Sequence, residues 1–155
     1  MSLIVYTDGA SRGNPGRGGF GIVLKWGATI REISEGFRHT TNNRMELLAV
    51  IVALEVLTRD GVNVTIYTDS KYVVDSVEKG WVFGWEKTGF AKKKNPDLWK
   101  RFLKAYRKHE VKFQWVKGHA DNPYNNRCDA LATAAADGEN LAIDHVYEQE
   151  EKGLF

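Results

Sequence analysis

The chain has 155 residues, 43% of them hydrophobic and 27% charged, a composition typical of one globular domain with a net charge of +2. No stretch approaches the ~20 apolar residues of a membrane-spanning helix, so we expect no membrane partner. The single cysteine, Cys128, excludes an internal disulfide, and a strand predicted from Leu3 leaves no room for a signal peptide; we therefore expect a cytoplasmic protein.

The first part of the chain predicts three strands and a long helix. Apolar alternation and β-branched residues indicate strands at residues 3–8, 20–25 and 29–37. Residues 9–19 contain five glycines and a proline and are expected to form a loop. Helical spacing of apolar residues predicts a helix over residues 41–60, stopped by Gly61.

The second part alternates strands and helices. Strands are predicted at residues 62–68 and 111–116, and helices at residues 70–79, 96–109 and 123–137, with one helical turn and a loop over 81–90. This order predicts an α/β fold in which helices flank both faces of a five-stranded mixed sheet. We expect one domain over residues 1–137, followed by a loosely held acidic tail over residues 138–155.

A basic segment stands out between residues 87 and 117. It contains eleven Lys or Arg and two acids, whereas residues 137–151 contain six acids and no Lys or Arg. Basic runs of this kind bind nucleic-acid phosphates, although they also form solvated helix faces. Because Lys92, Lys93 and Lys94 fall between two predicted helices, where no face needs solvation, we favour nucleic-acid binding.

Two aspartates follow the same tripeptide pattern. Tyr-Thr-Asp ends a predicted strand at Asp8 and again at Asp69. If the two strands are parallel neighbours, both carboxylates lie at the carboxyl edge of the sheet, where open α/β sheets bind ligands. Two acids held there repel each other unless a proton or cation intervenes. The alternative is two unrelated strand-end turns, where Asp is common.

Two further acids lie on helix faces with small or apolar neighbours. Glu46 shares its face with Ala49, Val50 and Ala53, and Asp129 lies on the face of an alanine-rich helix beside Cys128. A buried acid is costly unless it is paired or bound to metal, although first-turn acids are also favoured by the helix dipole. For Cys128 itself we favour a small core thiol over a nucleophile.

The four carboxylates of Asp8, Glu46, Asp69 and Asp129 come from four predicted elements and point to one sheet edge. Oxygen-only ligands suit magnesium or manganese, and no Cys/His cluster supports zinc. His119 lies in a predicted flexible loop that leads to the Asp129 helix. It is either a proton shuttle near this site or an incidental loop residue.

These blocks together resemble bacterial type 1 ribonuclease H. The resemblance covers about residues 3–136 and rests on the segments 6–9, 40–46, 67–70, 115–119 and 126–129. It implies a ribonuclease H-like fold and hydrolysis of the RNA strand of RNA–DNA hybrids by two magnesium ions, which manganese can replace, with 5′-phosphate and 3′-hydroxyl products. It implies metal-binding catalytic roles for Asp8, Glu46, Asp69 and Asp129, and a catalytic role for His119. We expect a monomer.

The resemblance also implies contacts with the hybrid duplex. The matching positions are Asn14, Asn42 and Asn43 on the RNA strand, Thr41 in a DNA-phosphate pocket, Trp81 in the DNA-strand groove, and Lys87, Lys92, Lys93 and Lys94 in a basic protrusion. Asparagine also suits loops and helix caps, so the two interpretations of the Asn residues stand together.

The chain departs from the family pattern at Lys71, His39 and Gly84, where the family often has Gln, Arg and Asn. Proofreading-type exonucleases of similar fold carry a second acid where this chain has Ala10, which argues against that class. Integrase-like enzymes would not be expected to carry Asn42 and Asn43 together with a basic segment. A non-catalytic hybrid-binding module is an alternative of another class, and it would not need acids on apolar faces.

Overall fold

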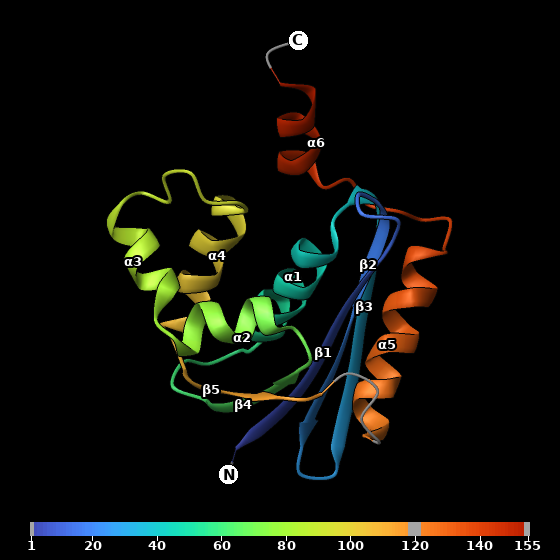
Figure 1. Cartoon of the computed structure of the whole chain (residues 1–155). Coiled ribbons are helices and arrows are strands. Elements are labelled where there is room, and N and C mark those ends of the chain that lie inside the picture. The colour runs from blue at the N-terminus through green and yellow to red at the C-terminus, as the bar shows by residue number, and fades with distance from the viewer. Residues whose placement is uncertain (1, 118–121, 154–155) are drawn as a thin grey trace.

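The structure is a computed structural model that describes residues 2–117 and 122–153 (Figure 1). The strands are β1 (Leu3–Arg12), β2 (Gly16–Trp26), β3 (Thr29–Thr40), β4 (Asn63–Thr68) and β5 (Glu110–Trp115). The helices are α1 (Asn42–Glu55), α2 (Lys71–Glu78), α3 (Trp81–Lys87), α4 (Pro96–Tyr106), α5 (Pro123–Ala136) and α6 (His145–Lys152).

The five strands form one mixed sheet in the order β3-β2-β1-β4-β5. The β1–β2 and β2–β3 pairs are antiparallel, and β4 is parallel to both β1 and β5. Helix α1 packs against β1 and β2, while α5 covers β1, β2 and β3 on the opposite face. The predicted α/β fold, with a mixed sheet flanked by helices on both faces, is confirmed.

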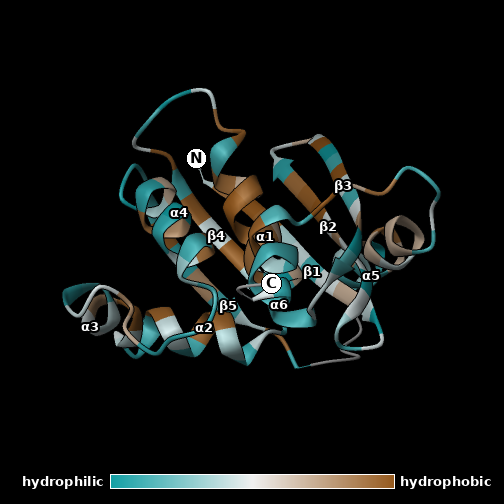
Figure 2. Ribbon diagram, turned by 90° about the horizontal axis from the view of Figure 1, so that it is seen from above, coloured by the Kyte–Doolittle hydropathy of each residue, from teal (hydrophilic) through white to brown (hydrophobic). Residues whose placement is uncertain are grey.

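The core lies between α1 and the sheet. Ten of the eleven residues of α1 from Arg44 to Leu54 are buried. Hydrophobic residues accordingly concentrate on α1 and the central strands in Figure 2.

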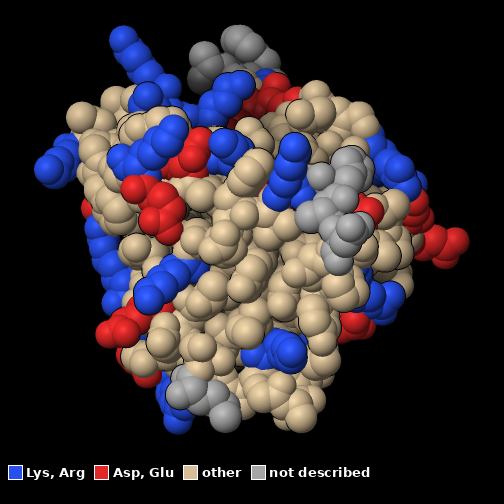
Figure 3. All heavy atoms as spheres, turned by 60° about the horizontal axis from the view of Figure 1, so that its bottom comes forward, with Lys and Arg blue, Asp and Glu red and all other residues tan. Residues whose placement is uncertain are grey.

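Seen from the side of β4 and β5 in Figure 3, much of the middle of the surface is uncharged, and charged groups lie mostly around it. No helix in the described part of the chain combines the length and apolar character needed to cross a membrane.

The prediction of a loop over residues 9–19 is wrong, because β1 and β2 continue as a long hairpin until Arg12 faces Arg17. Glycines of β2 serve close packing instead of turns. A Cβ atom on Gly19 would lie 2.6 Å from the backbone oxygen of Ala132, and one on Gly21 would lie 2.3 Å from that of Cys128. These glycines therefore let α5 approach the sheet. Helix α1 also ends earlier than predicted, at Glu55.

The expectation of a loosely held tail is wrong for the segment from Ala142 to α6. The backbone of Ala142 pairs with β3, accepting from the Arg38 amide at 3.0 Å and donating to the Gly36 carbonyl at 2.8 Å. Asp144 is buried and binds the side chain of Arg44 at 2.7 Å. The buried guanidinium of Arg44 also binds Asp97 at 2.7 Å, so one arginine joins α1, the start of α4 and the tail.

Candidate active site

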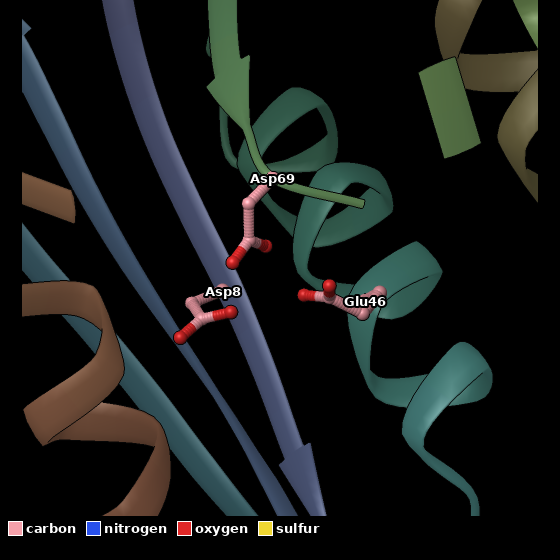
Figure 4. Close-up of side chains that lie close together, drawn as sticks. All are labelled: Asp8, Glu46 and Asp69. Carbon is pink, nitrogen blue, oxygen red and sulfur yellow. The ribbon is translucent and has the colours of Figure 1, made fainter. Parts of the chain in front are cut away.

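Three acidic side chains meet where β4 separates from β1 (Figure 4). Carboxylate oxygens of Asp8, Glu46 and Asp69 all lie within 4.8 Å of one another. The parallel pairing of β1 and β4 ends with Tyr6 opposite Tyr67, so Asp8 and Asp69 each lie two residues beyond the last paired position. Asp69 follows the end of β4, whereas Asp8 lies inside β1, which was predicted to end at Asp8 but continues to Arg12. The repeated Tyr-Thr-Asp pattern therefore does bring the two carboxylates together, at the point where β1 and β4 diverge.

Glu46 reaches this edge because α1 packs unusually close to β1. The Gly9 amide donates a hydrogen bond to Glu46 Oε1. A Cβ atom at Gly9 would lie 2.4 Å from the Glu46 backbone nitrogen, so a larger residue would push the helix away. Sequence reasoning missed this role for Gly9, because the strand was predicted to end at Asp8; in the structure Gly9 lies inside β1, where a glycine typically marks the close approach of another backbone.

The cluster is electrostatically unfavourable when all its groups are ionised. Burial, followed by the charge of Asp69, raises the pKa of Asp8 to about 8. Burial, followed by the charges of Asp8 and Asp69, raises the pKa of Glu46 well above its ordinary value. A proton or a hard divalent cation relieves such repulsion, and an oxygen-only donor set of this kind fits magnesium or manganese.

Asp129 approaches Asp8 from the opposite face of the sheet, on α5. It is exposed, and its proximity contributes to the raised pKa of Asp8. It is not within the 4.8 Å cluster formed by the other three acids. His119, the fifth predicted catalytic residue, lies outside the described residues. The adjacent Cys128 is fully buried, and burial raises the pKa of its thiol to about 12, in agreement with the core role favoured from the sequence.

A groove runs beside the N-terminus of α1 and brings together five of the residues predicted to bind nucleic acid. It has a volume of ≈ 500 Å³, and its lining includes Asn14, Thr41, Asn43, Lys93 and Lys94. Two of these side chains also accept hydrogen bonds from backbone amides at the N-terminus of α1. The Thr41 hydroxyl accepts from the Arg44 amide at 3.2 Å, and the Asn14 side chain accepts from the Asn42 amide at 3.1 Å.

The other four predicted nucleic-acid residues are not part of the lining of this groove. Asn42 is half-buried as the first residue of α1, and the remaining three are exposed. Trp81 is 47% exposed at the start of α3, with the Lys79 ammonium 5.2 Å from its ring centre. Lys87 ends α3, and Lys92 is exposed in the segment that follows. Because all three side chains are accessible to solvent, they are available to a ligand, and their binding role stays a prediction.

Two positions that depart from the family pattern have defined surroundings. The His39 side chain binds Glu151 of α6, and the Lys71 ammonium lies 4.6 Å from the ring centre of Trp115. The Trp115 indole in turn donates to the Asp69 backbone oxygen at 3.1 Å. The third position, Gly84, is exposed on α3.

Comparisons with known proteins agree over most of the chain. The family model for RNase H matches residues 1–137. The chain is 54% identical over 147 residues to a ribonuclease H of Desulforamulus reducens, covering 92% of each chain. It is 53% identical over 159 residues to a ribonuclease H of Lachnoclostridium phytofermentans, covering 96% of this chain and 100% of the relative.

Solved structures give the same result. LC9-RNase H1, a type 1 RNase H with the type 2 active-site motif, superposes with a TM-score of 0.78 at 31% identity, covering 98% of this chain and 81% of that one. LC11-RNase H1 in complex with an RNA/DNA hybrid superposes with a TM-score of 0.65 at 28% identity, covering 88% of this chain and 97% of that one.

Proposed function

The chain belongs to the RNase H family, and on that basis we propose that it cleaves the RNA strand of RNA–DNA hybrids using two divalent metal ions. The observation that carries this proposal is the cluster of Asp8, Glu46 and Asp69, whose carboxylate oxygens lie within 4.8 Å of one another. A module that only binds hybrids would gain nothing from such a costly arrangement of acids.

We assign the metal-binding role to Asp8, Glu46, Asp69 and Asp129. Asp8 lies between the other acids, which suits it to contact both cations. Bound magnesium, or manganese in its place, would supply an activated water and stabilise the leaving oxygen. The products would carry 5′-phosphate and 3′-hydroxyl ends. We assign to His119 an assisting role in proton transfer or product release.

We propose that the groove and the adjacent basic residues hold the duplex. Asn14, Asn42 and Asn43 would sense the 2′-hydroxyls of the RNA strand, which distinguish RNA from DNA. Phosphates of the other strand would contact Thr41, and the basic protrusion and Trp81 would extend the grip. The complex of LC11-RNase H1 with a hybrid supports this choice of ligand. A monomeric state and a cytoplasmic location stay predictions.

A cleavage assay tests the proposal directly. Purified protein is mixed with matched hybrid, double-stranded RNA and double-stranded DNA, with magnesium or with a chelator. We expect cleavage of the hybrid alone, only with the metal, and its loss in Asp8→Asn. The exposed acid Asp60 provides a matched control, because Asp60→Asn makes the same chemical change away from the cluster. Hybrid binding without cleavage by the wild type would instead favour a binding module.

A further inference from the structure

Helix α6 is held to the domain by its acidic side chains. None of its residues is buried. Glu148 binds the guanidinium of Arg38 at 2.8 Å, and Glu151 binds His39. The Tyr147 ring lies 5.6 Å from the ring of His39, centre to centre. Two basic side chains at the end of β3 are thus occupied by acids of the helix.

The same helix also forms one side of the groove described above. Tyr147 and Glu150 line it together with Lys93 and Lys94. Among the residues that the structure describes, Glu150 and these lysines form no ion pair with any partner. An unneutralised carboxylate therefore borders the space in which a phosphate backbone would meet the lysines.

We propose that α6 is an acidic wall of the nucleic-acid groove that lowers the affinity of the protein for its substrate. Glu150 repels phosphates that enter the groove, while Glu148 neutralises Arg38 and Glu151 occupies the side chain of His39. The occupant we infer is a phosphodiester strand, because the rest of the groove lining offers lysines and amide groups. This inference rests on the proposed function and assigns α6 a part in setting substrate affinity.

Substitution of Glu150 isolates the charge from the anchoring contacts of the helix. Removing one exposed like-charge interaction should lower KM for the hybrid about two- to five-fold in Glu150→Gln. Glu150→Lys should lower KM further, and both effects should shrink as salt is added because exposed charges are screened. The effect should appear in KM and not in kcat, since an interaction common to the bound ground state and transition state is removed.

Asp60→Asn is the matched control. Asp60 is exposed beyond the C-terminal end of α1, whereas Thr41 caps the other end. The helix has 14 residues and so spans about 21 Å, which places Asp60 far from the groove. Its KM should equal that of the wild type at every salt concentration.

A chain ending at Asp144 provides a second variant, because it removes α6 and keeps the pair between Arg44 and Asp144. If its thermal melt shows a folded protein, its KM should fall at least as far as that of Glu150→Gln, since Arg38 and His39 are also released. If it does not fold, the two Glu150 variants alone test the acidic wall.

Unchanged or raised KM in both Glu150 variants, with an active wild type, overturns the acidic wall. Absence of hybrid cleavage by the wild type would instead overturn the proposed function.

Discussion

Replacing Asp8 by Asn should stabilise the metal-free protein at neutral pH, because it removes a carboxyl group that is difficult to ionise in the folded state. Burial and the charge of Asp69 raise the pKa of Asp8 from 3.8 to about 8. The folded protein keeps this proton over a pH range in which the unfolded chain releases it. Stability therefore falls as the pH rises from about 4 to about 8, and the amide variant avoids that loss.

The size of the effect follows from the pKa shift. At about 1.4 kcal/mol per pKa unit, the free energy of unfolding lost through Asp8 is roughly 4 kcal/mol at pH 7. This is an upper limit, because Asp8 is only partly buried and solvent can relax around its charge. We expect Asp8→Asn to be more stable than the wild type by about 1–4 kcal/mol at pH 7, and nearly equal to it at pH 4.

Urea unfolding with a chelator at three or more pH values between 4 and 8 measures this difference. Asp60→Asn serves as the control and should show no pH-dependent change relative to the wild type. Added magnesium should stabilise the wild type more than Asp8→Asn, because binding to the folded state adds to its free energy of unfolding. A difference between Asp8→Asn and the wild type that does not vary with pH would refute the reasoning.

Three further predictions concern binding, catalysis and stability. Neutralising Lys92, Lys93 and Lys94 together should raise KM for the hybrid. It should also reduce the slope of log binding constant against log salt concentration by about 0.9 for each phosphate that these lysines neutralise in the wild type. An unchanged slope would mean that the lysines form only a solvated loop. His119→Ala should slow turnover by up to ~10²–10⁴-fold without abolishing it, and an unchanged kcat at saturating hybrid would exclude a role. Arg44→Ala should destabilise the protein by about 3–5 kcal/mol in urea unfolding, because it leaves two carboxylates without their buried partner, and a decrease below about 1 kcal/mol would contradict this.

The acidic cluster was largely predictable because its geometry follows from local patterns. The two strands that contain Tyr-Thr-Asp become parallel neighbours, and their pairing stops where Tyr6 faces Tyr67, so Asp8 and Asp69 lie together just beyond it. Glu46 was predicted from helical spacing, which placed an acid on the buried face of α1. The contribution of Gly9 was not predicted, because the close approach of α1 to β1 is a tertiary contact.

The hairpin of β1 and β2 was missed because glycine has two opposite uses. In a sequence, a glycine-rich stretch favours a turn, since glycine adopts positive φ without strain. Glycine also allows a helix to pack closely on a strand, and Gly19 and Gly21 serve that purpose under α5. Composition cannot separate these uses, because the helix that supplies the close contact begins more than 100 residues later, at Pro123.

The role of the tail was missed although the reasoning applied to Glu46 extends to it. An acid on an apolar helix face predicts a cation nearby, and in the same way a buried base predicts acidic partners. Arg44 lies one turn before Leu48 on a buried stretch of α1, yet no acidic partner was predicted for it from the sequence. Its partners Asp97 and Asp144 are 53 and 100 residues away, so only its charge could have linked them. Asp144 of the acidic tail is therefore a counter-charge for a buried arginine, and this anchoring places α6 beside the groove.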